Sequence, residues 1–224
     1  MNYVGRILKA QGQEDKTKIE LEIDENIIET LERQRPKELE LILDDGRRIT
    51  ASQRKKAYAT INDIAHFTGD VPEAIKEHYK YQLMIKSGVD YFSLKDCSVS
   101  TAREYITAMI DDCIEYGIPL GDYGANRTDD IDRYLYMCLK TRTCAITGRK
   151  GADIHHVLGS RIGMGRNRLR VDHGNLKLIA LSREWHTRVH AEGEENIFKK
   201  FKIYGIKADR KLLRELKLKY EDIS

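Results

Sequence analysis

Cysteine is scarce in this sequence, and long apolar runs are missing from it. The four cysteines show no paired spacing, which is typical of free thiols in a reducing compartment, so disulfides are not expected. No apolar run approaches the roughly 18 residues of a membrane-spanning helix, and the start MNYVGRILKAQ lacks the apolar core of a signal peptide. These absences predict a cytoplasmic protein without a membrane partner.

The small net charge of +3 hides an asymmetry along the chain. Residues 1–140 carry 20 basic and 26 acidic side chains, a net charge of −6, whereas residues 141–224 carry 19 and 10, a net charge of +9. A basic segment favours a polyanion, because each phosphate that it neutralises releases counterions. DNA is therefore the expected partner of the second part, and a merely solvated basic surface is the alternative.

Residues 1–140 are expected to form a mixed α/β domain. Alternating side chains at 3–9 and 17–23 predict a β-hairpin, and a second hairpin is predicted from 38–43 and 47–50 around Asp45-Gly46. Capping and periodicity predict helices at about 25–33, 50–67, 72–88, 98–116 and 129–140. The second and third of these helices are expected to lie antiparallel and to pack on the hairpins. Thr128 is expected to cap the last helix, and the preceding PLGDYGANR to be a loop.

Five of the seven histidines lie between residues 144 and 190, at spacings that metal chemistry can use. Residues 152–158 alternate and predict a short strand that carries His155 and His156 on opposite faces. A second strand is predicted at 176–181.

A helix is predicted after the second strand, with Ser182 as its N-cap and an end near residue 191. His186 and His190 are four residues apart on this helix and therefore share one face, about 6 Å apart along its axis. The spacing predicts that these two imidazoles can bind one cation together.

This order of strand, loop, strand and helix, with His155, His156, Asn175, His186 and His190, resembles the HNH endonucleases, the ββα-metal or His-Me finger group. The resemblance implies that His155, His186 and His190 bind one divalent metal ion. It also implies that His156 is the general base and that Asn175 holds the loop and the base in place. A neutral imidazole can take a proton from water near pH 7, and the ion can offset charge on the scissile phosphate.

The metal and its chemistry are only partly defined by the sequence. Mg²⁺ or Mn²⁺ is expected from the resemblance, and Zn²⁺ or Ni²⁺ stays open because imidazole favours softer ions. Many HNH domains add a zinc ion bound by two Cys-x2-Cys pairs. Here the corresponding positions hold Cys144, Thr147, Ser182 and Trp185, so no structural all-cysteine zinc is expected.

The segment SRIGMGRNRLR, residues 160–170, lies between the two predicted strands. Guanidinium groups suit phosphate, so nucleic-acid contacts are expected from its arginines and from one lysine nearby: Arg161, Arg166, Arg168, Arg170 and Lys177. A solvated charge run is the alternative. His173, in the turn-like VDHGN, is expected to be a solvated loop histidine.

Two further resemblances concern the biological setting. Residues 47–80 resemble the NinB type of phage recombination protein, which binds single-stranded DNA. This resemblance implies phosphate contacts from five basic residues: Arg47, Arg48, Arg54, Lys55 and Lys56. A basic face that is only solvated is an equally weighted alternative. The motif, the order of elements and the ending GEENIFKKFKIYGIK also resemble the HNH nucleases encoded in phage and prophage recombination or replication clusters of Gram-positive bacteria, and this likeness covers most of the chain. That likeness implies phage or host recombination and replication proteins as partners.

Together these patterns predict an α+β fold with three parts. N-terminal β-hairpins with a helical bundle occupy residues 1–140, a ββα-metal HNH domain occupies 141–206, and a C-terminal helix lies in 207–224. The predicted function is a metal-dependent DNA endonuclease that hydrolyses phosphodiester bonds. The alternative is a non-catalytic recombination mediator that binds single-stranded DNA and uses the HNH fold as a scaffold.

Overall fold

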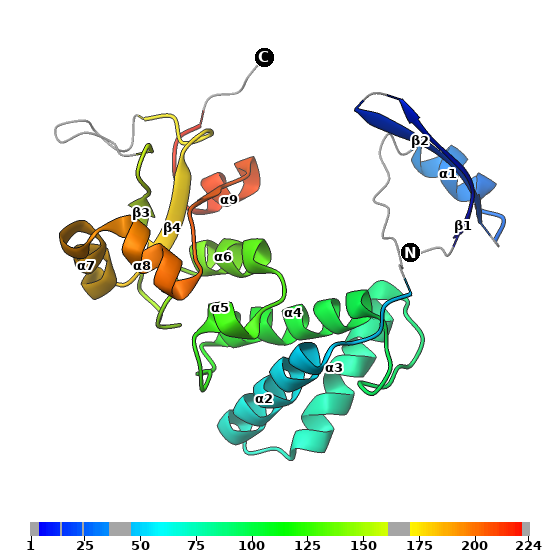
Figure 1. The fold of residues 1–224 in the computed structure, drawn as a ribbon, viewed down its shortest axis with the longest axis horizontal. Coiled ribbons are helices and arrows are strands. Elements are labelled where there is room, and N and C mark those ends of the chain that lie inside the picture. The colour runs from blue at the N-terminus through cyan, green and yellow to red at the C-terminus, as the bar shows by residue number, and fades with distance from the viewer. Residues whose placement is uncertain (1–4, 14, 24, 36–45, 161–170, 221–224) are drawn as a thin grey trace.

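The computed structural model describes residues 5–13, 15–23, 25–35, 46–160 and 171–220. In this part of the chain, helices are combined with two small antiparallel sheets, so the predicted α+β class is confirmed (Figure 1). No helix in these ranges is both long enough and apolar enough to cross a membrane.

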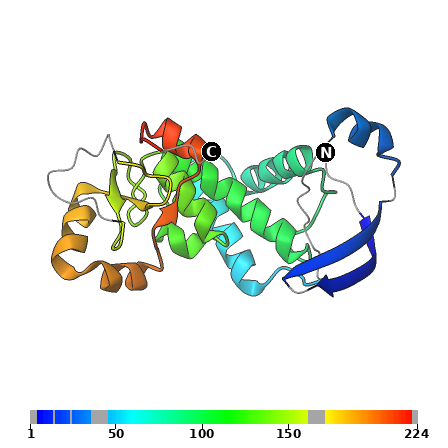
Figure 2. The ribbon, with the colours of Figure 1, turned by 90° about the horizontal axis from the view of Figure 1, so that it is seen from above.

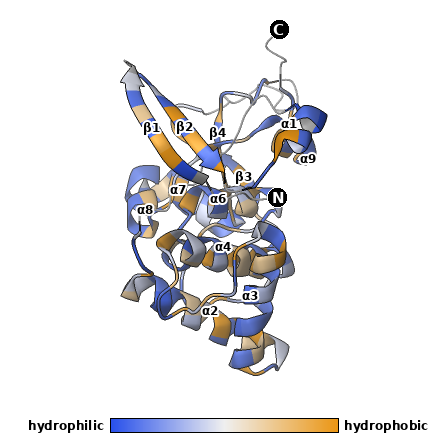
Figure 3. Cartoon of the chain, turned by 90° about the vertical axis from the view of Figure 1, so that its right-hand side faces the viewer, coloured by the Kyte–Doolittle hydropathy of each residue, from blue (hydrophilic) through white to orange (hydrophobic). Residues whose placement is uncertain are grey.

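The N-terminal hairpin forms as predicted. Strand β1 (Gly5–Gln13) pairs antiparallel with β2 (Lys16–Ile23), and helix α1 (Ile28–Gln34) follows. Figure 3 shows apolar segments along both strands, yet Ile7 and Leu8 are 47% and 54% exposed. No described residue of this hairpin belongs to the buried core, so the expectation that the second and third predicted helices pack on it is wrong. Figure 1 shows the hairpin to one side of the long helices.

The second predicted hairpin falls partly on residues 36–45, which lie outside the described ranges. Its expected second strand, 47–50, makes a different pairing: Arg48 forms an isolated antiparallel bridge with Ser98. The backbone NH of Ile49 donates to the carbonyl of Cys97 at 2.8 Å, and Val99 donates to Arg47 at 3.0 Å. These bonds join the segment just before the second helix to the segment just before the fourth helix.

Three long helices form the bundle: α2 (Ala51–Thr68), α3 (Pro72–Ser87) and α4 (Val99–Tyr116). Thr50 and Gln53 form the predicted capping box, and Gly69 ends α2 with a φ of 80° that favours glycine. α2 and α3 pack on each other and on α4. The buried side chains that fill this interface include Ile61, Leu83, Tyr105 and Ile106.

Helices α5 (Gly124–Arg127) and α6 (Ile131–Lys140) connect the bundle to the second sheet. The loop predicted at PLGDYGANR thus contains a short helix. Asp130 caps α6 by accepting from the NH of Arg133 at 2.9 Å, so the assignment of Thr128 as the cap is wrong. Helix α6 contacts both α4 and the central strand of the second sheet, and Leu135 and Leu139 are fully buried in it.

Replacing Gly124 with alanine is expected to destabilise the protein by about 1–3 kcal/mol, because overpacking forces side chains and backbone to shift. A Cβ atom at this position would lie 2.5 Å from Cε2 of Tyr134 and would also clash with its hydroxyl group. That ring is 2% exposed, and its hydroxyl donates to the carbonyl of Ala145 at 2.9 Å, so it has little room to move. Chemical denaturation measures the loss. Gly12→Ala, where a Cβ meets nothing within 4 Å, is the control, and an equal effect of both changes would contradict the packing explanation.

The second sheet has the order β3-β4-β5 and is antiparallel throughout. Strands β3 (Asp153–His156) and β4 (Lys177–Leu181) match the two predicted strands, whereas β5 (Ile206–Lys207) was not predicted. The register places His155 opposite Ile179 and His156 opposite Leu178. β3 is therefore an edge strand, and β4 is the buried centre.

Helices α7 (Arg183–Glu192) and α8 (Glu194–Phe201) follow β4 and pack against each other. Ser182 caps α7 as predicted, since its hydroxyl accepts from the NH of Trp185 at 3.4 Å. Figures 1 and 2 show α7 and α8 at the opposite end of the molecule from the hairpin. The C-terminal helix is shorter than predicted: α9 (Arg210–Glu215) has six residues, of which Leu212 and Leu213 are buried.

Candidate metal centre

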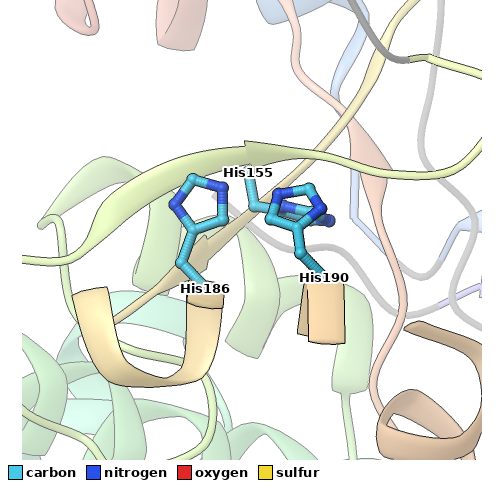
Figure 4. Close-up of side chains that lie close together, drawn as sticks. All are labelled: His155, His186 and His190. Atoms are coloured by element: carbon cyan, nitrogen blue, oxygen red, sulfur yellow. The ribbon is translucent and has the colours of Figure 1, made fainter. Parts of the chain in front are cut away.

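Three histidines converge at the contact between β3 and α7 (Figure 4). His155 comes from the strand, and His186 and His190 come from successive turns of the helix. One possible ligand nitrogen from each ring lies within 4.8 Å of the other two, and the ring centroids are 4.9–5.1 Å apart. The structure thus brings together the three residues that the sequence predicts as metal ligands.

His155 is the most enclosed of the three, with 1% of its side chain exposed. Its Nε2 lies 2.9 Å from Oε2 of Glu194, the first residue of α8. Burial lowers the pKa of His155 below its usual value, and the hydrogen bond with Glu194 opposes this shift without cancelling it. The ring is therefore neutral near pH 7, which is the protonation state that binds a metal ion.

His186 also has a carboxylate beside it. Its Nδ1 lies 3.4 Å from Oδ2 of Asp153, and the same oxygen is 3.2 Å from Nε of Arg183. Asp153 is two residues before His155 on β3 and therefore points to the same face of the sheet. With Nδ1 directed at Asp153, Nε2 is the nitrogen that His186 can offer to an ion.

The donor set fits a divalent cation. Three imidazole nitrogens are a frequent protein contribution to catalytic metal sites, in which the remaining coordination positions are taken by water or substrate. Nitrogen ligands favour Zn²⁺, Ni²⁺ or Co²⁺ in affinity over Mg²⁺, so the availability of the ion also decides which one is bound. Within the described residues, this is the one group of histidines, cysteines and carboxylates whose ligand atoms converge in this way.

Cys144 and Trp185, two of the positions compared above with the Cys-x2-Cys pairs of many HNH domains, are packed into the fold. Cys144 is buried, and its sulfur accepts from the NH of Thr147 at 3.5 Å. The ring of Trp185 packs edge-on against Phe201, with 4.9 Å between the centroids. Apolar contacts therefore join α7 and α8 at this place.

His156 points to the other face of β3, as alternation along a strand requires. Its ring centroid lies 5.3 Å from that of His173. The prediction that His173 is a solvated loop histidine is wrong, because this residue is completely buried. The carbonyl of Lys219, in the segment after α9, accepts from the backbone NH of His173 at 2.9 Å and lies 3.1 Å from its Nδ1.

The structure describes two of the other predicted site residues, Asn175 and Lys177, and both lie at the β4 end of the segment between β3 and β4. Oδ1 of Asn175 accepts from Nζ of Lys207 at 3.4 Å, and Lys207 pairs with Lys177 across β4 and β5. Lys177 is exposed, and its NH donates to the hydroxyl of Ser160 at 2.9 Å. The four arginines predicted to contact DNA lie outside the described residues: Arg161, Arg166, Arg168 and Arg170.

The basic residues near the start of α2 mostly bind neighbouring segments. Nζ of Lys56 lies 2.5 Å from Oδ1 of Asp129, and a guanidinium nitrogen of Arg54 donates to the carbonyl of Lys95 at 2.8 Å. Arg48 donates to the carbonyl of Asp96 at 3.3 Å. These contacts show that part of the basic face of α2 holds the bundle together.

Comparison with known families gives a match over most of the chain. The family described as "Putative HNHc nuclease" matches residues 19–219. This range contains β3, β4, α7 and all five residues of the histidine and asparagine motif. Comparisons with curated proteins and with solved structures give no match. Because the match covers far more than half of the sequence, and because the three histidines converge within it, the chain belongs to this HNH nuclease family.

Proposed function

We propose that this member of a nuclease family is a metal-dependent endonuclease that hydrolyses phosphodiester bonds of DNA. The observation that carries the proposal is the convergence of His155, His186 and His190 from a strand and a helix on one point. Three imidazole nitrogens within a basic part of the chain suit a cation that must also contact phosphate.

The residues of the motif are assigned separate roles. His155, His186 and His190 hold the ion. When bound, the ion supplies electrostatic stabilisation of the charge that grows on the scissile phosphate. His156 takes the proton from the attacking water, and Asn175 anchors the chain just before β4, through its contact with Lys207.

The edge position of β3 supports this division of roles. His155 and His156 point to opposite faces of the strand, so a phosphate lying on either face alone could meet only one of them. No strand pairs with β3 on its outer side within the described residues. We propose that the scissile phosphodiester crosses this edge, between the three clustered histidines on one face and His156 on the other.

Basic side chains beside the site suit the DNA backbone. Lys177 and Lys207 lie side by side on β4 and β5, on the face that also carries His155. The arginines of 161–170 belong to the segment that joins β3 to β4, and we propose that they contact phosphate as well. The proposed division into residues 1–140, 141–206 and 207–224 assigns this site to the middle part. A cytoplasmic role in phage recombination or replication is the proposed setting.

A nuclease assay tests the proposal. The full-length protein is incubated with single-stranded, duplex and branched DNA in the presence of Mg²⁺, Mn²⁺, Co²⁺, Ni²⁺ or Zn²⁺, and in excess EDTA. Cleavage that requires an ion is expected with at least one substrate. The proposal is wrong if none of these ions supports cleavage of any substrate, or if the rate in EDTA equals the rate with metal.

A second function, a non-catalytic mediator that binds single-stranded DNA, is favoured by one observation. Arg47, Arg48 and Arg103 line a pocket of about 570 Å³ beside the starts of α2 and α4. Guanidinium groups that gather in this way suit a phosphate backbone. Two results together would support this function instead of the first. The full chain would bind single-stranded DNA, and Arg103→Ala would weaken this binding. The full chain would also cleave no DNA with any of the ions.

A further inference from the structure

The carboxylate of Glu194 connects three parts of the candidate metal centre. Glu194 is the first residue of α8, and its side chain is only 10% exposed. Oε2 lies 2.9 Å from Nε2 of His155, and Oε1 accepts from the backbone NH of Leu158 at 2.7 Å. One side chain therefore holds a candidate ligand, the chain just after β3, and the start of a helix that is 39 residues away from His155.

The chemistry of this contact defines which nitrogen of His155 remains for an ion. An ionised carboxylate can only accept hydrogen bonds, so the imidazole must donate from Nε2. A neutral ring that carries its proton on Nε2 has its lone pair on Nδ1. The bond to Glu194 thus selects one tautomer and leaves Nδ1 as the possible metal-binding atom.

His186, a second candidate ligand, also faces a carboxylate, but with Nδ1 instead of Nε2. Nδ1 of His186 is directed at the carboxylate of Asp153, which leaves Nε2 for the ion. The two carboxylates come from different elements, β3 and α8, yet each lies beside a different imidazole of the cluster. Asp153 is shared with Arg183, whereas Glu194 divides its two oxygens between His155 and the NH of Leu158.

The surroundings of Glu194 strengthen its hydrogen bond. His155 is 1% exposed, and the ring of Phe198 from the next turn of α8 lies 6.3 Å from the His155 ring. A hydrogen bond to a charged acceptor is stronger where water is excluded than where it is present. The orientation of the His155 ring is therefore expected to depend on this carboxylate more than on solvent.

We propose that Glu194 is a positioning residue of the metal centre, which holds His155 in the tautomer and orientation that direct Nδ1 at the ion. The inference rests on the proposed metal site and extends it to a residue outside the histidine motif. Carboxylates that accept from a metal-bound histidine fix the ring and raise its basicity, and their loss typically costs 10- to 100-fold in metal affinity or activity.

Titration with Co²⁺ tests this role in the full-length protein. Glu194→Gln retains a carbonyl oxygen that can accept from the NH of Leu158, but it removes the negative charge beside His155. Isothermal calorimetry is expected to show a Co²⁺ dissociation constant about 10- to 100-fold higher than in the wild type. The melting temperature without metal is measured as well, so that the Co²⁺ affinities of two folded proteins are compared. Glu195→Gln, at the next and exposed position of the same helix, is the matched control and should leave the Co²⁺ affinity unchanged.

The absorption spectrum of the Co²⁺-saturated protein separates positioning from direct coordination. If Glu194 acts through His155, Glu194→Gln keeps the visible band positions of the wild type once the site is saturated. A shift of these bands would place the carboxylate among the ligands and overturn the positioning role. An unchanged dissociation constant would overturn the inference alone, whereas a wild-type protein that binds no Co²⁺ would overturn the proposed metal site together with it.

Discussion

Replacing His186 with alanine is expected to abolish metal-dependent DNA cleavage and to weaken Co²⁺ binding by more than about 100-fold. The expected loss exceeds the 10- to 100-fold typical of residues that merely support a ligand, because one of the three proposed ligand nitrogens is removed. Two histidines then remain in the cluster, one on β3 and one on α7. Calorimetry with Co²⁺ and a nicking assay on the preferred DNA measure both effects.

The matched control for this variant is His66→Ala. His66 is also a helical histidine, but it is exposed on α2, in the bundle. Its replacement should change neither Co²⁺ affinity nor cleavage. If His186→Ala cleaves DNA at the wild-type rate in the same metal, the three histidines do not form the catalytic metal site.

Replacing His156 with alanine is expected to lower the cleavage rate by about 10²- to 10⁴-fold, the usual contribution of a general base. Co²⁺ affinity should stay at the wild-type value, because the His156 side chain points to the face of β3 opposite the three clustered histidines. Single-turnover kinetics at saturating metal measure the chemical step, and a gel-shift assay checks that DNA binding persists.

The pair of variants separates metal binding from proton transfer. His186→Ala should lose both Co²⁺ binding and cleavage, whereas His156→Ala should lose cleavage alone. Wild-type cleavage by His156→Ala would rule out its role as the base. A parallel loss of Co²⁺ affinity in His156→Ala would instead indicate that this ring supports the ion.

The features that the sequence predicts well depend on neighbours close in the chain. Thr50 and Ser182 cap their helices as expected, and Gly69 ends α2, since each acts on groups within four residues. The pairing of His186 with His190 follows from the helical repeat in the same way. Only the approach of His155 to this pair required the family resemblance, because nothing local brings β3 to α7.

The features that the sequence failed to predict depend on distant contacts. His173 reads as a turn residue, but the carbonyl of Lys219, 46 residues later, covers it and accepts from its backbone NH. Strand β5 has two residues, too few for a pattern, and exists because they pair with β4. Glu194 looks like an ordinary acidic residue at a helix start, and only the fold reveals its contact with His155.

The cap of α6 shows a different limit. Thr128 and Asp130 are both good capping residues, two positions apart, and the sequence offers no way to rank them. In the fold, the NH of Asp130 donates to the hydroxyl of Thr128 at 3.0 Å, and Asp130 is left to cap the helix. Competition between equally suited neighbours is decided by the turn that precedes the helix.

Helix α6 has a consequence for the cooperativity of the bundle and the second sheet. Its buried leucines, Leu135 and Leu139, are packed between α4 on one side and β4 on the other, so a single hydrophobic core runs through both. Unfolding of the bundle would therefore remove the core contacts of the sheet that carries the histidines. Differential scanning calorimetry should show the bundle and the sheet unfolding in a single endotherm. Limited proteolysis should therefore show no preferred cleavage near residue 140. Binding of an ion to the three histidines should also raise the melting temperature of the helical bundle.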